Sequence, residues 1–275
     1  MKKFAILLLA GGAAGISTPA FAQDESPFGG FYGGLTVGVA ASDNKSDGTT
    51  TFDRGNNGSF GETVTTIGGA NAFSPGFCGG YANGPTPGVG CDDEHEGIDY
   101  SARLGYDVML GDNFLVGVVG EVGKSSIDDA ATAFSTTPAF YQFQRETELV
   151  TALRGRIGVT AGQALVYGTG GVAYAKMDNT FTSSNTANSF TQNGADAWEW
   201  GWQAGGGAEF AISRNASFGV EYLYNRINAD DYSVTVGQGS AGATNPFVLA
   251  GGVTMKPEED NFQWHSVRAT LNFHF

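Results

Sequence analysis

Seven charged residues occupy one face of segments in which polar and apolar residues alternate. Arg154 and Arg156 are two residues apart, so in a β-strand both side chains point to the same side. Charges enclosed together must be paired, and removing one partner of a buried pair typically costs about 3–5 kcal/mol. The pattern therefore predicts a packed salt-bridge network, with a charge-lined ion pathway as the alternative. The predicted network consists of Arg103, Glu121, Arg154, Arg156, Glu209, Glu221 and Arg268.

The histidines and serines do not have the spacing that nucleophilic catalysis needs. His265 and Ser266 are adjacent, and neighbouring residues of a strand point to opposite faces, so the two cannot share a proton there. The other histidines are His95, in a loop, and His274, at the opposite end of a predicted strand. We therefore expect a protein that is not an enzyme and that has no cofactor and no cysteine–histidine metal site.

Two cysteines, Cys78 and Cys91, are separated by 12 residues. An even count in an exported chain favours a disulfide, which stabilises the fold by roughly 3 kcal/mol for a loop of this size. The alternative is a pair of free thiols in a mobile loop. The acidic residues at 92–96 follow directly and could bind a divalent cation, but their spacing matches no cation-binding loop. We interpret them as a solvated acidic loop.

The elements that position these residues are segments with a period of two. In the clearest one, Ile98, Tyr100 and Ala102 alternate with Asp99, Ser101 and Arg103. Each segment has roughly the 9–13 residues that a tilted strand needs to cross a bilayer. The predicted strands are 31–41, 98–108, 114–124, 148–160, 164–177, 198–210, 217–227 and 264–275.

The connections between these segments alternate between long and short. The long ones are roughly 43–97, 125–147, 178–197 and 228–262, and the short ones are turns at 111–113, 161–163 and 213–215. This arrangement predicts an all-β, eight-stranded antiparallel transmembrane β-barrel with long extracellular loops and short periplasmic turns. The loops are rich in Gly, Ser, Thr, Asn and Asp, so we expect them to be mobile and water-exposed. A soluble lipocalin-like barrel is the competing fold, but it would place apolar residues inside.

The first 22 residues are typical of a cleaved export signal, with a basic start, an apolar stretch at 4–16 and the small-x-small site at 20–22. Residues 23–275 then form one predicted domain. After the signal no run reaches the roughly 18 apolar residues of a spanning helix, and a soluble periplasmic protein is the alternative. The net charge of −14 argues against nucleic acid as a partner.

Two sets of apolar residues carry further predictions. Leu271, Phe273 and Phe275 share one face of the last strand, and we expect the barrel-assembly machinery to recognise them as an assembly signal. Aromatic residues at headgroup depth form a girdle, and a carbohydrate-binding patch is the alternative. The predicted girdle consists of Trp198, Trp200, Trp202 and Trp264.

Several strand motifs resemble a known family. They are Leu153-Arg154-Gly155-Arg156-Ile157-Gly158, Val166-Tyr167-Gly168-Thr169-Gly170-Gly171-Val172-Ala173-Tyr174, Gly205-Gly206-Gly207-Ala208-Glu209-Phe210 and Val220-Glu221-Tyr222-Leu223-Tyr224. With the terminal Phe275 they resemble the opacity-like small outer-membrane β-barrels of Gram-negative bacteria, relatives of the OmpA and OmpX barrels.

This resemblance implies location in the bacterial outer membrane and no shared catalytic residues. It also implies a structural role in the envelope, with surface loops that interact with lipopolysaccharide, a host or the environment. Function in such folds is carried by the loops, for which the sequence suggests no ligand. A narrow ion-conducting pore and an adhesin are the alternative functions.

Overall fold

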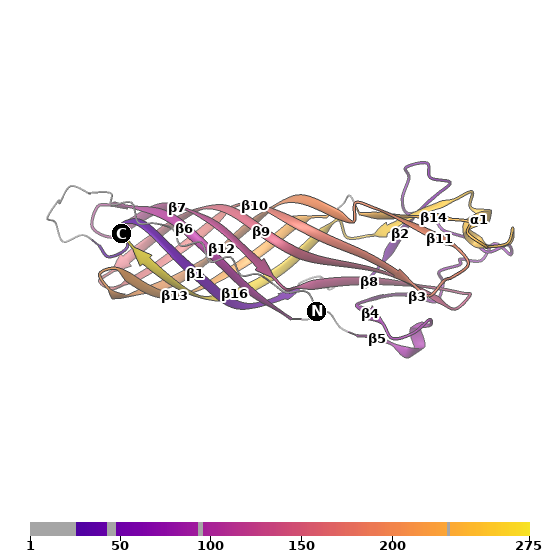
Figure 1. Cartoon of the computed structure of the whole chain (residues 1–275), viewed down its shortest axis with the longest axis horizontal. Helices are drawn as coiled ribbons and strands as arrows, with labels where there is room; N and C mark the ends of the chain where they lie inside the picture. The colour runs from indigo at the N-terminus through magenta and orange to yellow at the C-terminus, as the bar shows by residue number, and fades with distance from the viewer. Residues whose placement is uncertain (1–25, 43–47, 93–95, 230–231) are drawn as a thin grey trace, which may run out of the picture.

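The computed structural model describes residues 26–42, 48–92, 96–229 and 232–275. Within these residues eight long antiparallel strands pair in a closed ring (Figure 1). The ring runs β10-β12-β13-β16-β1-β6-β7-β9, and β9 pairs back with β10. Closure leaves no unpaired edge, which confirms the predicted barrel. The strands are β1 (Gly30–Ser42), β6 (Gly97–Leu110), β7 (Phe114–Ser125), β9 (Ala139–Ala161), β10 (Ala164–Ser183), β12 (Asp196–Ser213), β13 (Ala216–Asn228) and β16 (Asn261–His274).

The barrel wall is apolar outside and polar inside. Leu104 is 73% exposed on the outer surface, whereas its neighbour Arg103 is 3% exposed in the interior. This is the reverse of a lipocalin-like barrel, and it is the arrangement of a barrel surrounded by lipid. The short turns lie together at one end of the barrel, and two of them contain glycines with positive φ, Gly111 at 70° and Gly162 at 61°. We call this the short-turn end and the opposite one the long-loop end.

The strands of one hairpin are much longer than predicted. β9 and β10 stay paired from Ala161 and Ala164 out to Tyr141 and Ser183, beyond the rest of the wall (Figure 1). The polar–apolar alternation predicts only the part of this hairpin that faces lipid. Beyond the membrane the two strands contact elements of the head, so their faces no longer divide into a lipid side and a barrel interior. The extension carries the structure at the long-loop end.

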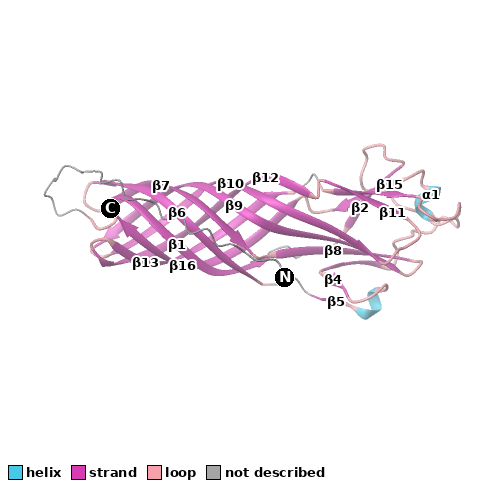
Figure 2. Ribbon diagram, viewed as in Figure 1, coloured by secondary structure: helices cyan, strands magenta, loops and turns pink. Residues whose placement is uncertain are grey.

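The long connections fold into a structured region, which we call the head (Figure 2). A second sheet runs β11-β14-β15-β2, and β3 and β8 continue the barrel sheet beside β9. Many described residues of these connections therefore lie in strands or in a buried core, whereas the sequence predicts water-exposed loops. The elements of the head are β2 (Thr50–Arg54), β3 (Gly76–Gly79), β4 (Tyr81–Ala82), η1 (Pro87–Val89), β5 (Cys91–Asp92), β8 (Asp128–Ser135), β11 (Ser189–Asn193), β14 (Ser233–Gly237), α1 (Pro246–Leu249) and β15 (Val253–Pro257).

The head has an aromatic core of its own. Phe73 packs against Phe52, Tyr141 and Phe247, with ring centroids 4.4, 5.3 and 6.0 Å away. These four residues come from three connections that are far apart in the sequence, so local composition gives no sign of their contact. Burial of this apolar surface is what orders loops that are otherwise rich in glycine and polar residues.

The helical elements are short: α1 has four residues and η1 has three. Among the described residues, no helix is long and apolar enough to cross a membrane.

Candidate functional site in the barrel interior

Glu221 lies at the centre of the barrel interior and accepts from three arginines. Its carboxylate lies 2.7 Å from Arg268, 3.3 Å from Arg103 and 3.4 Å from Arg154. The Tyr167 hydroxyl donates to the second Glu221 oxygen at 2.8 Å. Every one of these side chains is buried, so the charges are satisfied by one another and not by bulk water.

A second carboxylate closes this network. Glu121 lies 2.8 Å from Arg154 and 2.7 Å from Arg268, and Arg268 also reaches Asp99 at 3.2 Å. Two arginines are thus each shared by the same two glutamates. We call Arg103, Arg154, Arg268, Glu121, Glu221 and Asp99 the charged layer.

Arg156 forms a separate group closer to the short-turn end. Its guanidinium lies 3.1 Å from Glu209 and 3.6 Å from Asp107, and it donates to the Tyr32 hydroxyl at 3.0 Å. The same guanidinium lies over the Tyr167 ring, 4.2 Å from its centroid. All seven charged residues that the sequence predicts inside the barrel do lie there. The sequence does not predict that they divide into two groups, or that Asp99 and Asp107 join these groups.

Above the charged layer, toward the head, the interior is apolar. The Trp264 and Phe262 rings pack with their centroids 5.2 Å apart and their planes tilted by 38°, and both are buried. The prediction that Trp264 belongs to an outer aromatic girdle is therefore wrong, since it is 1% exposed. The reason is the strand alternation itself, because Trp264 has the same parity as the inward Arg268. This apolar layer on the head side of the interior comprises Ala40, Ile127, Val150, Ala173, Ala175, Met177, Ile227, Ala229, Phe262 and Trp264.

Below the charged layer, the short-turn end is also closed by apolar residues. Phe28 precedes β1 and is fully buried, with its ring 6.1 Å edge-on to His274. This apolar layer at the short-turn end of the interior comprises Phe28, Leu115, Leu165, Tyr167 and Ala211. The hollow between Trp264, Arg268 and Glu121 is only about 10 Å³, the space of about one water molecule. From the head to the short-turn end, the interior is thus filled by an apolar layer, the charged layer, the Arg156 group and a second apolar layer.

Aromatic residues gather on the outer wall of β10, β12 and β13. Trp198, Trp200 and Trp202 are exposed there, as their alternation predicts. Tyr174 on β10 stacks with Trp198 at 5.0 Å and lies 4.6 Å from Trp200, and Trp202 lies 5.3 Å from Tyr224 on β13. We call these five residues the aromatic band.

The comparisons with known proteins agree with this geometry. Residues 5–244 match the model of the outer membrane protein beta-barrel domain. The chain belongs to this family. It is 26% identical over 225 residues to the 31 kDa outer-membrane immunogenic proteins of Brucella melitensis and Brucella suis, which covers 78% of this chain and 85% of each relative. The outer membrane protein OprG from Pseudomonas aeruginosa aligns over 90% of this chain and 97% of its own, with 13% identity and a TM-score of 0.49.

Membership of this family places the protein in the outer membrane of a Gram-negative bacterium. The long-loop end with its head is then extracellular and the short-turn end periplasmic, as the strand connections predict. The predicted signal peptide at 1–22 lies outside the described residues.

The predicted disulfide is confirmed. Cys78 and Cys91 are bonded with their Cα atoms 6.6 Å apart, which joins β3 to the β4–β5 hairpin in the extracellular head. Of the acidic tract, residues 93–95 lie outside the described residues, and Asp92 accepts from Asn83 at 3.0 Å. The described residues contain no group of three or more His, Cys, Asp or Glu placed to hold a metal.

A serine, a glutamate and a histidine that the sequence did not bring together form a hydrogen-bonded set in the barrel interior. Ser217 Oγ donates to Glu209 at 3.0 Å and lies 3.0 Å from Nε2 of His274. Here the serine sits between the acid and the histidine, whereas nucleophilic catalysis needs the histidine in the middle. His265 and Ser266 are separated as predicted, since Ser266 is buried and donates to Asp99 while His265 contacts Tyr222 on the outer wall.

The predicted assembly signal lies on the outer wall at the periplasmic end. Leu271, Phe273 and Phe275 are all exposed, and the backbone N–H of Phe275 donates to the carbonyl of Phe31 at 2.9 Å. These side chains are accessible to another protein during assembly, so their proposed role is compatible with their position.

Proposed function

We propose that this outer-membrane barrel is a closed anchor that holds a folded head at the cell surface and does not conduct ions. The observation that carries the proposal is the filled interior, in which a charged layer lies between two apolar layers. Ion pathways need polar groups that a moving ion can contact in turn. Here the arginines and carboxylates contact one another, and an apolar layer crosses the interior on each side of them.

The head is the surface on which we expect interactions, and its attachment to the barrel supports this role. Arg145, buried at the junction, forms an ion pair with Asp129 and donates to the carbonyl of Glu259 at 2.8 Å. Its guanidinium also lies 6.0 Å from the Phe262 ring at the top of the barrel. Such a junction holds the head in a fixed position, where it can meet lipopolysaccharide, a host molecule or another surface.

The remaining parts of the proposal concern biogenesis, anchoring and chemistry. We propose that the barrel-assembly machinery recognises Leu271, Phe273 and Phe275, and that the aromatic band lies at headgroup depth. The protein is proposed to be non-enzymatic, because Ser217, which contacts both a carboxylate and a histidine, is fully buried and lies between the two. The name of the Brucella relatives describes them as immunogenic, which supports exposure of the head at the surface.

The test is ion conductance of the refolded protein in a planar bilayer. We expect no steady current for the wild type. Arg154→Ala, which removes a buried partner of both Glu121 and Glu221, is compared with Arg214→Ala in an exposed periplasmic turn. A steady wild-type current that changes with Arg154→Ala and not with Arg214→Ala would overturn the proposal and make the protein a narrow pore.

A further inference from the structure

The outer face of β13 changes from apolar to charged along its length. Phe218 and Val220, near the periplasmic end, are exposed on the wall, and Tyr222 and Tyr224 follow them. The next outward residue is Arg226, close to the end of the strand that leads to the head. Apolar residues of a barrel wall face hydrocarbon, and aromatic residues gather where the lipid headgroups begin. Arg226 therefore lies at the level of the headgroups.

The neighbouring strand β16 shows the same change at the same level. Its exposed Val267 is followed toward the head by His265 and then by Gln263. In the β13–β16 register His265 lies opposite Tyr224, and Gln263 lies opposite Arg226. The His265 ring packs on the Tyr224 ring with the centroids 5.2 Å apart. Two adjacent strands thus place a border of rings just below a set of polar side chains.

The polar side chains above this border can donate hydrogen bonds to a ligand. Arg226 Nε donates to Oδ1 of Asn261 at 3.2 Å, and the Tyr224 hydroxyl donates to Oε1 of Gln263. These two bonds engage the oxygen atoms of both amides. No described residue accepts a hydrogen bond from the amide nitrogens of Asn261 and Gln263 or from the terminal nitrogens of Arg226. The cluster therefore presents donors, and donors fit an anion.

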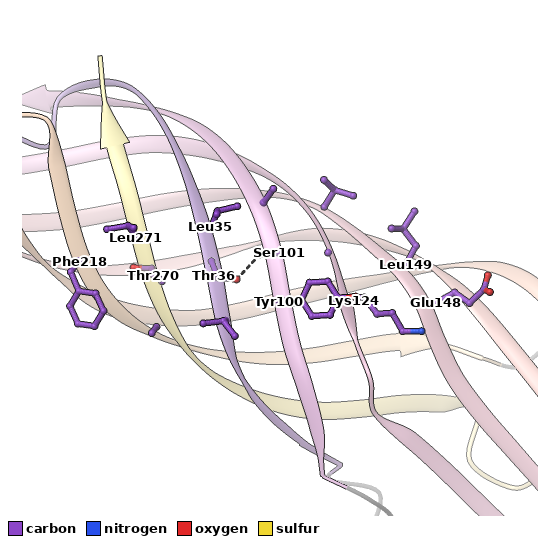
Figure 3. Close-up of a pocket in the computed structure, with 15 residues that line it drawn as sticks. Leu35, Thr36, Tyr100, Ser101, Lys124, Glu148, Leu149, Phe218, Thr270 and Leu271 are labelled. Carbon is purple, nitrogen blue, oxygen red and sulfur yellow. Dashed lines mark hydrogen bonds between the residues drawn. The ribbon is translucent and has the colours of Figure 1, made fainter. Parts of the chain in front are cut away.

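Arg226 also differs from the lysines of the wall in having no acidic partner. It is half-buried, and no carboxylate of the described residues forms an ion pair with it. Lys124 lies at one end of a hollow across β1, β6, β7 and β16 (Figure 3). It pairs with Glu146 at 3.4 Å, and Lys176 pairs with Glu148. The charge of Arg226 is thus available to a ligand, whereas the charges of these lysines are satisfied within the chain.

We propose that Arg226, Gln263 and Asn261 bind a phosphate group of lipid A, the phosphorylated anchor of the lipopolysaccharide in the outer leaflet. The guanidinium fork matches two phosphate oxygens, and the amides donate to the remaining ones. The acyl chains of the same molecule then lie over Val220 and Val267, below the border of rings. Because no carboxylate takes part, the phosphate binds directly and needs no bridging divalent cation. This site on the barrel wall is separate from the interior and the head on which the proposed function rests.

The experiment counts lipids bound to the refolded full-length protein in detergent by native mass spectrometry, with and without EDTA. The probes are lipid A with its phosphates, lipid A with the phosphates removed, and inorganic phosphate as a competitor. We expect one phosphorylated lipid A per chain, bound about tenfold more tightly than the dephosphorylated form, a preference of about 1.4 kcal/mol. Equal binding of the two forms, or binding that EDTA abolishes, would overturn the proposal. Displacement of lipid A by inorganic phosphate would show a site for the free ion and would overturn it too.

Three variants locate the site. Arg226→Gln should weaken the binding of phosphorylated lipid A about tenfold, to the level of the dephosphorylated form. Gln263→Glu keeps the size of the side chain and still accepts from Tyr224, but it replaces an amide donor with a charge that repels phosphate, so it should weaken binding as well. Lys124→Gln, elsewhere on the wall, is the control and should bind as the wild type does. Heat-modifiable mobility checks that each barrel is folded. If Arg226→Gln does not fold, Gln263→Glu decides, and wild-type binding by that variant contradicts the proposal.

Discussion

Arg268 and Glu221 face each other across the β13–β16 register, and their side chains meet at 2.7 Å in the middle of the barrel. Neither residue is an isolated partner. Glu221 also accepts from Arg103 and Arg154, and Arg268 also reaches Glu121. The stability of the barrel therefore depends on a network in which one carboxylate contacts three guanidinium groups, with Glu121 and Asp99 as further partners of the arginines.

Replacing Glu221 with glutamine should destabilise the barrel strongly. Arg103, Arg154 and Arg268 would lose their shared carboxylate while remaining buried, and loss of a partner from a buried pair costs about 3–5 kcal/mol. The measurement is urea unfolding in lipid vesicles, followed by tryptophan fluorescence. Glu148→Gln, in a half-exposed pair on the outer wall, is the control and should have a much smaller effect. Equal midpoints for the two variants would show that the charged layer does not hold the barrel.

How much of this fold the sequence predicts depends on whether a contact follows from alternation. The wall and its inward charges do, because parity along β6 or β16 decides which face each residue takes. Trp264 shows that alternation predicts the face of a residue better than its type does. Its position in the alternation of β16 places it inside, although tryptophan is typical of an outer aromatic girdle. The head does not follow from alternation, because Phe73, Tyr141 and Phe247 come from three different connections.

Arg145→Met should loosen the head and leave the barrel intact. The change removes the ion pair with Asp129 and the bond to the Glu259 carbonyl, and it leaves a buried carboxylate at the junction. Hydrogen exchange should speed up in β8 and β15, while exchange in β12 and β13 stays slow. Arg214→Met in a periplasmic turn is the matched control. Faster exchange throughout the barrel would instead show that the junction belongs to the barrel's own cooperative unit.

Loss of the disulfide should open the first extracellular connection. In Cys78→Ser with Cys91→Ser, the β4–β5 hairpin keeps its short pairing, the bond from the Ala82 N–H to Gln142 at 3.0 Å and the bond from the Tyr81 hydroxyl to Asp128, but it loses its covalent link to β3. A disulfide that closes a loop of this size contributes roughly 3 kcal/mol. Proteinase K added to whole cells should then cleave between residues 76 and 97, with the barrel protected. If the double variant resists protease as well as the wild type does, the packing of β3 on β8 is sufficient to hold this segment.

Deleting Phe275 should reduce the amount of barrel in the outer membrane more than it reduces the stability of barrel that has assembled. The ring is exposed at the periplasmic end, so its loss removes little packing, although the Phe275 N–H bond to Phe31 is lost too. The measurement compares heat-modifiable protein in outer-membrane fractions with urea stability after refolding from inclusion bodies. Phe210→Ala, an exposed aromatic elsewhere on the wall, is the control. Wild-type amounts in the membrane after the deletion would contradict an assembly role for this residue.

Alkaline pH should weaken the head before it weakens the barrel. Burial, with the nearby Asp178 carboxylate, raises the pKa of Tyr232 above its ordinary value of 10.0, and burial also raises the pKa of Tyr141. A folded head therefore keeps both phenols protonated where an unfolded one would ionise them. Stability from this source is complete below pH 10 and declines as the pH rises beyond it.

Phenolate absorbance, recorded with head-specific hydrogen exchange, should show ionisation and opening together above pH 10. Tyr232→Phe removes one ionisable phenol but also its hydrogen bond to Gln192 at 2.7 Å, so its stability should depend less steeply on pH even if it is lower at pH 7. An unchanged slope in this variant would mean that Tyr232 does not contribute to the alkaline transition.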